Sequence, residues 1–450
     1  MTDEGAGGHT EDGAGGHTDD GAGGHTGDGS SAGTEVAHRD LQQRTMRVLV
    51  TSQVLGGVGV GSGVAVVGLL AYQLSGTASL SGVSATASTL GSAAAAIVIA
   101  RLSVARGRRP GLVTGYLVGA IGAALAIVAA VLGVFWLHVV ASLAFGWSSA
   151  SNLQARYAAT DLAGPSTRAR SLSTIVWATT IGAVLGPNLT GPGEAVSELL
   201  TLPPLAGAYL FSLASFLAAA LVQAVWLRPD PLHVLRATAA VPAVADTGWD
   251  TVRRALRTIR AIPEAQVAVL AITAAHAVMV GVMVMTPVHM EGNGAALNLV
   301  GLTISLHIAG MYALSPVMGA LADRVGRRAV VLFGVVQLAA AAVLAGVADP
   351  MGTVLFPGGL ILLGTGWSAC LIAGSAWLTD AVPVEDRPAV QGASDLAMNL
   401  AGAVGGTLAG IVLAIAGYAA LAFGSLVLLL PAALGALRLR GADHVGASTG

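Results

Sequence analysis

Apolar runs of about 20 residues follow one another through most of the chain, and they limit its fold more than any other feature. The runs lie at 47–73, 79–101, 111–133, 135–158, 171–191, 204–227, 265–288, 298–319, 328–348, 353–379, 389–415 and 417–437. A run of this length spans the hydrocarbon core of a bilayer as a helix, which satisfies its own backbone hydrogen bonds in lipid. The sequence therefore predicts an all-α, polytopic membrane protein with twelve transmembrane helices.

The composition agrees with a membrane location. Hydrophobic residues make up 54% of the 450 residues and charged residues only 10%, whereas a soluble globular protein carries about 25% charged residues. The net charge of −2 gives no reason to expect a nucleic-acid partner. We expect the lipid bilayer and a small-molecule or metal-ion substrate as partners of a monomeric chain. The one cysteine, Cys370, cannot form an intramolecular disulfide.

Two polar regions divide the chain. Residues 1–46 carry a Gly-rich, His-containing and acidic repeat of eight residues, which has nothing apolar to bury and predicts a disordered tail. The long internal connection holds an amphipathic, arginine-rich stretch, which we expect to lie along the membrane surface. The predicted parts are the tail 1–46, an N-terminal six-helix bundle 47–228, a central loop 229–263, a C-terminal six-helix bundle 264–438 and a short tail 439–450.

Basic residues predict the orientation of the chain in the membrane. The chain has no lysine, and its 22 arginines all fall on one side of a twelve-helix arrangement. Loops on the opposite side carry acidic residues and no arginine. Because basic loops stay on the cytoplasmic side, we expect both termini in the cytoplasm and a location in the cell inner (plasma) membrane.

The two halves repeat each other at an offset of 219 or 220 residues. The matched residues are 107–109 with 326–328, Asp161 with Asp380, and Arg168 with Arg387. Six helices separate the copies, so both copies have the same orientation. This pattern predicts a parallel duplication about an axis along the membrane normal.

A loop motif follows the eighth run, with the pattern G-x-x-x-D-R-x-G-R-R. Its residues are Gly319, Asp323, Arg324, Gly326, Arg327 and Arg328. The motif resembles that of the major facilitator superfamily, which carries it after the second helix of each half. The resemblance covers about 47–438, and it implies secondary transport in which the halves rock around a central cavity.

The chemistry of this motif suits a cytoplasmic latch. Gly319 permits a close approach of helices, and Asp323 can face a helix N-terminus or an arginine. We assign the same conformational role to Asp161, Arg168, Asp380 and Arg387. The first-half copy has Val104 where the motif has its acid, which weakens any latch there. Near the start of the eleventh run, Asp395 is either a candidate site residue or a partner of Arg387 eight residues before it, and we favour the pairing with Arg387.

Methionine and histidine gather in one part of the second half, where six of the ten methionines fall within 279–318. His276, Met279 and Met283 share one face of the seventh helix, and His307 and Met311 share one face of the eighth. Thioether and imidazole ligands select Cu(I) over Mg²⁺ or Ca²⁺. The spacing therefore predicts a soft site for a metal ion.

The pairs Met279 with Met283 and His307 with Met311 resemble the MxxxM and HxxxM motifs of the CcoA-like copper importers of the superfamily. The resemblance implies that these four residues bind copper as a substrate, and no cofactor is expected. Relatives of that group also carry organic nutrients such as riboflavin, and methionine is a good filler of irregular helix contacts.

Three functions remain open after this comparison. The first is copper uptake. The second is a carrier or proton-linked exporter of small organic molecules, in which the methionines form an adaptable wall and a histidine titrates. The third is a receptor that does not transport. No P-loop, nucleophile motif or nucleotide fingerprint is present, so we expect no enzyme activity.

Overall fold

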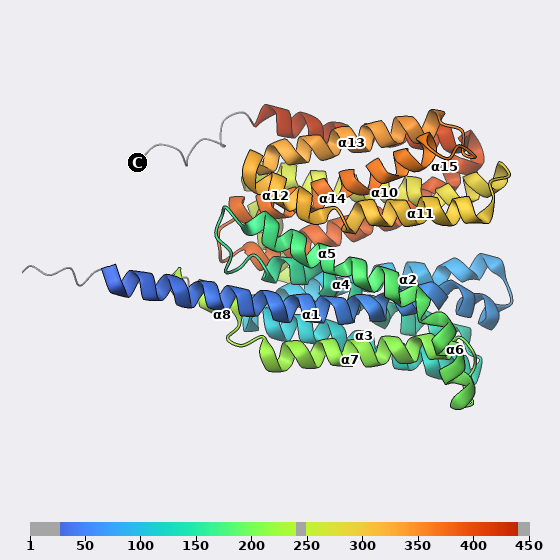
Figure 1. Ribbon diagram of the computed structural model, residues 1–450, viewed down its shortest axis with the longest axis horizontal. Helices are drawn as coiled ribbons and strands as arrows, with labels where there is room; N and C mark the ends of the chain where they lie inside the picture. The colour runs from blue at the N-terminus through green and yellow to red at the C-terminus, as the bar shows by residue number, and fades with distance from the viewer. Residues whose placement is uncertain (1–27, 240–248, 440–450) are drawn as a thin grey trace, which may run out of the picture. The chain divides into compact units, whose positions relative to one another are not determined.

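The computed structural model describes residues 28–239 and 249–439, and within these ranges the chain is helical, with no strand (Figure 1). The helices are α1 (Asp28–Ser75), α2 (Ala78–Arg106), α3 (Arg108–Leu132), α4 (Phe135–Ala158), α5 (Arg168–Asn188), α6 (Thr190–Leu199), α7 (Ala206–Trp226), α8 (Pro231–Thr238), α9 (Trp249–Ala261), α10 (Pro263–Gly292), α11 (Leu297–Tyr312), α12 (Ser315–Val325), α13 (Arg327–Val347), α14 (Leu355–Ala381) and α15 (Arg387–Arg438).

The predicted twelve transmembrane helices are confirmed. Within the described ranges, nine helical segments are long and apolar enough to cross a membrane, and α5 with α6 forms a tenth that is bent by 50°. Gly417, with a φ of 82°, divides α15 into two spans. The twelfth span is α4, which is 24 residues long.

Equivalent tight turns join consecutive spans in the two halves. Gly107 separates α2 from α3 with a φ of 90°, and Gly326 separates α12 from α13 with a φ of 96°. Residues with a side chain rarely adopt such angles, so glycine is needed at both places. The turns lie 219 residues apart, as the difference between 326 and 107 gives, and they preserve the geometry of the duplicated motif.

The structure describes part of each tail and part of the central connection. Residues 1–27 of the predicted disordered tail lie outside the described residues, and α1 begins at Asp28, within the predicted tail. The chain divides into a unit of residues 1–41 and a second unit, which begins at Gln42 and contains the membrane helices. The central connection contains α8 and α9, and α9 packs against α10 and α15. Of the predicted tail 439–450, only Leu439 is described.

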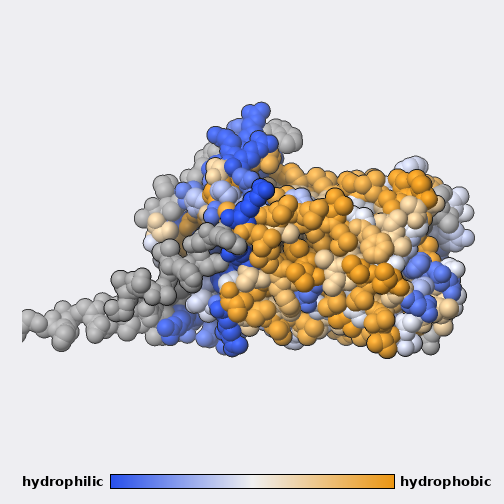
Figure 2. All heavy atoms as spheres, turned by 90° about the horizontal axis from the view of Figure 1, so that it is seen from above, coloured by the Kyte–Doolittle hydropathy of each residue, from blue (hydrophilic) through white to orange (hydrophobic). Residues whose placement is uncertain are grey.

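Large apolar side chains cover the outer faces of the membrane helices. Ile121, Val336 and Ile415 are 56%, 65% and 81% exposed. Figure 2 shows a broad hydrophobic band on one face, with hydrophilic residues gathered toward its ends. Such a surface would favour aggregation in water, whereas lipid tails solvate it, so the chain is a multi-pass membrane protein.

Candidate substrate cavity and gate

A cavity of about 420 Å³ lies between the two halves of the membrane domain. Helices α1, α2, α4 and α5 line it from the first half, and α10, α11, α14 and α15 line it from the second. The volume falls in the range of small-molecule sites, about 300–1,000 Å³. Its hydrogen-bonding and aromatic lining residues include Gln53, Ser149, Asn152, Arg156, Thr179, His276, Tyr312, Trp367 and Asn399.

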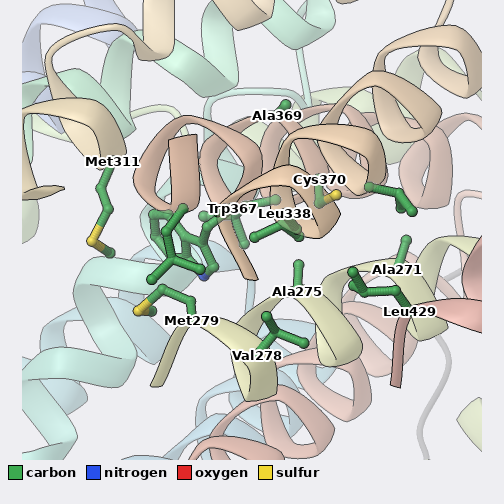
Figure 3. Close-up of a cluster of buried hydrophobic side chains, with 14 of the residues drawn as sticks. Ala271, Ala275, Val278, Met279, Met311, Leu338, Trp367, Ala369, Cys370 and Leu429 are labelled. Carbon is green, nitrogen blue, oxygen red and sulfur yellow. The ribbon is translucent and has the colours of Figure 1, made fainter. Parts of the chain in front are cut away.

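The structure brings three of the five predicted binding residues to this cavity. His276, Met279 and Met311 line it, and Figure 3 shows the two methionine side chains on the same side of Trp367. Met283 is half-buried and packs against the hydrophobic core of the second half. His307 is buried and lies outside the cavity lining. The helical faces were predicted from spacing alone, which does not say how much of a face reaches a cavity.

His276 is held in one tautomer by its neighbours. The indole N–H of Trp367 donates to Nδ1 of His276 at 3.1 Å, and an indole nitrogen can only donate. Nδ1 is therefore the acceptor, and Nε2 of the neutral ring carries the proton. Nε2 lies against α15 at Gly402, where an added Cβ would come within 2.8 Å of it. A ring in this state offers a hydrogen-bond donor and no free lone pair to a metal ion.

His307 joins α11 to α14. Its Nδ1 lies 2.9 Å from the carbonyl oxygen of Leu360, and because a carbonyl can only accept, Nδ1 donates this bond. Nε2 is buried and has no hydrogen-bond partner among the described residues. A metal-binding histidine is often oriented by such a bond to a carbonyl, but this one does not line the cavity.

Sequence reasoning missed a buried ion pair that joins the halves next to the cavity. Nη2 of Arg156 on α4 lies 2.5 Å from Oδ1 of Asp395 on α15, and both side chains are 1% exposed. The expected partner of Asp395 was Arg387, and that prediction was wrong. Arg387 instead donates to the carbonyl oxygen of Val382 at 3.2 Å. Charged residues inside apolar runs are a signal of function, but the sequence did not show which two would meet.

The motif after the eighth span lies against the first half. Oδ1 and Oδ2 of Asp323 accept hydrogen bonds from the backbone N–H groups of Ala169 and Arg170, at 3.1 and 2.9 Å. These groups lie in the first turn of α5, where the helix dipole favours a negative charge. Nη2 of Arg327 lies 3.1 Å from Oδ1 of Asp323. Asp323 thus has both kinds of neighbour that the sequence suggested, while its role in gating stays a prediction.

The same contact depends on a glycine. A Cβ added to Gly319 of α12 would lie 2.2 Å from Oγ of Ser173 on α5. The two helices therefore approach closely where they hold Asp323 in place. Of the remaining motif residues, Arg324 is exposed, and Arg328 donates to the carbonyl oxygen of Ala436 at 2.6 Å.

The repeated acids and arginines lie at the same end, which we call the arginine-rich end. Asp380 forms ion pairs with Arg168 of the first half and with Arg327, the latter at 3.0 Å. In the first half, Arg108 forms an ion pair with Asp161 at 2.8 Å. Of these three ion pairs, the one between Arg168 and Asp380 joins the two halves, and its role in closing the cavity stays a prediction.

A family comparison agrees with this geometry. The model of the Major Facilitator Superfamily matches residues 49–296 and 267–449. The chain belongs to this superfamily of transporters. The uncharacterized MFS-type transporter YddS of Bacillus subtilis (strain 168) is 38% identical over 393 residues, which cover 87% of this chain and 89% of the relative. The riboflavin transporter RfnT of Brucella anthropi is 27% identical over 357 residues, covering 79% and 85%.

Solved structures of the superfamily share the fold. The human organic anion transporter MFSD10 (TETRAN) superposes with a TM-score of 0.73 at 17% identity, covering 88% of this chain and 99% of that one. A bacterial homologue of the iron transporter ferroportin, in an outward-facing state with soaked iron, gives a TM-score of 0.68 at 13% identity, covering 87% and 98%.

The superfamily motif has lost its acid in the first half, and the central connection supplies other contacts there. Val104 occupies the position of Asp323. Asp386, at the N-terminus of α15, accepts a hydrogen bond from Thr258 of α9 at 2.7 Å and forms an ion pair with Arg254 of α9 at 3.3 Å. Asp230, which precedes α8, accepts hydrogen bonds from the first two backbone N–H groups of α3.

Proposed function

We propose that this chain is a secondary transporter that carries a small organic molecule through the central cavity by alternating access of its halves. The supporting observation is the lining of the cavity, which combines amides, aromatic rings and one arginine from both halves. Gln53, Asn152 and Asn399 offer donors and acceptors at different angles, and Trp367 offers an apolar face. A set of this kind recognises an extended molecule by several groups at once.

The family comparison supports the same substrate class. RfnT is named as a riboflavin transporter, and it matches most of this chain. Flavins are planar and carry several hydrogen-bonding groups, so a cavity with an indole ring and three amides fits molecules of this type. We therefore propose a planar, polar organic molecule rather than a bare ion as the natural cargo.

Copper is the second candidate, and one observation favours it. Met279, Met311 and Met398 come from three helices and all line the cavity, and uncharged thioethers bind Cu(I) well. Two observations weigh against the site predicted from the sequence, since Met283 and His307 do not line the cavity. Within the described residues, no group of three or more His, Cys, Asp or Glu side chains is placed to hold a metal ion.

A transport assay separates the two candidates. Vesicles containing the purified protein are exposed to a mixture of small metabolites that includes riboflavin, and separately to Cu(I), and the contents are analysed by mass spectrometry. We expect an organic compound to accumulate. Trp367→Ala should lower this accumulation at least about 10-fold, as a loss of about 1.4 kcal/mol of binding free energy would. Trp136→Ala is the control, because Trp136 is 67% exposed on the outer surface.

Variants of the cavity methionines test copper as the substrate. Met279→Leu with Met311→Leu removes two sulfurs and conserves volume, at a packing cost below about 1.5 kcal/mol. Met283→Leu is the matched control on the same helix. Accumulation of Cu(I) alone, lost in the double variant and kept in the control, would contradict the organic substrate and establish copper.

A further inference from the structure

The charge of the cavity is concentrated at one residue. Among the lining residues, Arg156 is the one with a permanent charge, and its partner Asp395 lies behind it. Oδ1 of Asp395 bonds to Arg156, while Oδ2 is buried and has no hydrogen-bond partner among the described residues. Arg156 also donates to the carbonyl oxygen of Leu153 and to the hydroxyl of Tyr157, at 2.6 and 3.1 Å. The guanidinium is thus fixed at the cavity wall.

One buried cation can balance only one buried anion. Removing a charge from water costs several kcal/mol unless an opposite charge compensates it. If an anionic group from the cavity binds Arg156 while Asp395 stays ionised, the buried site carries a net charge of −1. A proton on Asp395 removes this excess, and Oδ2 is the oxygen free to accept it.

The other charged and titratable groups near Asp395 have partners of their own. On α4 the phenol of Tyr157 accepts a bond from Arg156. On α3, Arg108 lies close enough to interact with Asp395 but is paired with Asp161. On α10, His276 bonds to Trp367. On α9, Arg254 pairs with Asp386. Asp395 is therefore the buried acid here that Arg156 neutralises, so a second anion at Arg156 would leave its charge unbalanced.

We propose that the cargo carries an anionic group, of the carboxylate type, that binds Arg156 while Asp395 takes up one proton. This inference rests on the proposed transport of organic molecules and adds the charge of the cargo and its coupling. The empty site holds an arginine cation and an aspartate anion. The loaded site holds the same cation, the anion of the cargo and a neutral aspartic acid. The proton comes from water on the side of binding and returns to water on the side of release, so anion and proton move together.

The experiment uses matched pairs of probes that differ in charge and hardly in shape. These are benzoate with benzamide, nicotinate with nicotinamide, and 2-naphthoate with 2-naphthamide, tested on the purified full chain by thermal shift and titration calorimetry. We expect at least one acid to stabilise the protein and its amide to bind at least about 10-fold more weakly. Proton uptake, followed with an indicator dye in weak buffer, should approach one proton per acid bound.

Variants at the ion pair test the two roles separately. In Asp395→Asn the acid should still bind, and no proton should be taken up. In the parent protein the affinity for the acid should fall as the pH rises, by up to about 10-fold per pH unit where Asp395 of the empty protein is ionised. Arg156→Gln alone leaves Asp395 buried without a cation and risks misfolding. Arg156→Gln with Asp395→Asn removes both charges and should fold while losing the preference for acids.

Each outcome decides a specific point. Equal binding of acids and amides overturns the anionic cargo and leaves the organic cargo standing. Binding of no organic probe, together with transport of Cu(I) alone, overturns both. Proton uptake that persists in Asp395→Asn overturns the assignment of the proton to Asp395.

Discussion

At the scale of single residues, the two halves differ in how their helices meet at His276. The offset of 219 residues places His276 opposite Gly57, and the offset of 220 places Gly402 opposite Gly182. In the first half these glycines let two backbones touch, since a Cβ on Gly182 would lie 2.5 Å from Cα of Gly57. In the second half an imidazole fills the space between the two helices. Where the first half has a direct contact between two helix backbones, the second half has a polar side chain that lines the cavity.

Gly402→Ala tests this arrangement. The new Cβ would lie 2.8 Å from both Nε2 and Cδ2 of His276, so the ring must move and its bond to Trp367 is strained. We expect a stability loss of about 1–3 kcal/mol, as for other overpacked sites, together with reduced transport. Gly410→Ala is the control, because nothing lies within 4 Å of its Cβ on the same helix. Equal thermal unfolding and transport of the two variants would contradict the packing role of Gly402.

The sequence predicted contacts of residues within short motifs, and it missed contacts between residues that lie far apart along the chain. Asp323 was expected to face a helix N-terminus or an arginine, because its residue type and its place in a short motif indicate such a partner. The partner of Asp395 was missed because Arg156 is 239 residues away, whereas Arg387 was a plausible local alternative. Apolar runs predicted the spans because each run carries its own signal. The cavity depends on how eight helices are rotated, and no single helix encodes that.

At the scale of elements, the arginine-rich end is built differently on its two sides. The contact between α5 and α12 uses the acid of the motif, Asp323, directly against a helix N-terminus. On the other side, the motif acid is replaced by Val104, and α9 contacts the start of α15 through Asp386. On this side the charged contacts at the start of α15 come from the central connection and not from the motif.

Asp323→Asn tests the side built from the motif. The substitution keeps the shape, but it leaves one acceptor oxygen for the two backbone N–H donors of α5 and removes the charge that pairs with Arg327. We propose that these contacts stabilise an arrangement that is closed at the arginine-rich end. A loss of about 1.4 kcal/mol changes the ratio of closed to open molecules 10-fold. We expect slower net transport, cargo affinity within a few-fold of the parent, and faster modification of a cavity cysteine from the arginine-rich end.

The control for this change is Arg324→Gln, which removes an exposed charge from the same motif. It should leave both the labelling rate and transport close to those of the parent. Parent-like transport by Asp323→Asn would show that the contact with α5 is not a latch.

At the scale of the whole molecule, the orientation in the membrane can be measured. We propose that the arginine-rich end faces the cytoplasm, because basic loops remain there. The native Cys370 is fully buried, so it should contribute little background to labelling. A cysteine at Arg257 or Arg324, both exposed, should react with a membrane-impermeant maleimide only after the cells are opened.

A cysteine at Glu291, exposed at the end of α10, should react in intact cells. Arg324 is a better position than Gly326, where the positive φ would strain any side chain. Labelling of Arg324→Cys in intact cells would reverse the proposed orientation while leaving the twelve spans unchanged.

The buried pair of Arg156 and Asp395 also affects how the carrier responds to voltage. A full charge that crosses a membrane gains or loses about 2.3 kcal/mol per 100 mV. The pair holds one positive and one negative charge at 2.5 Å, so moving it as a unit through the field requires almost no electrical work. Return of the empty carrier should then proceed at similar rates in polarised and depolarised membranes. The concentration gradients of the cargo and of the proton, and not the voltage, would then set the direction of net transport.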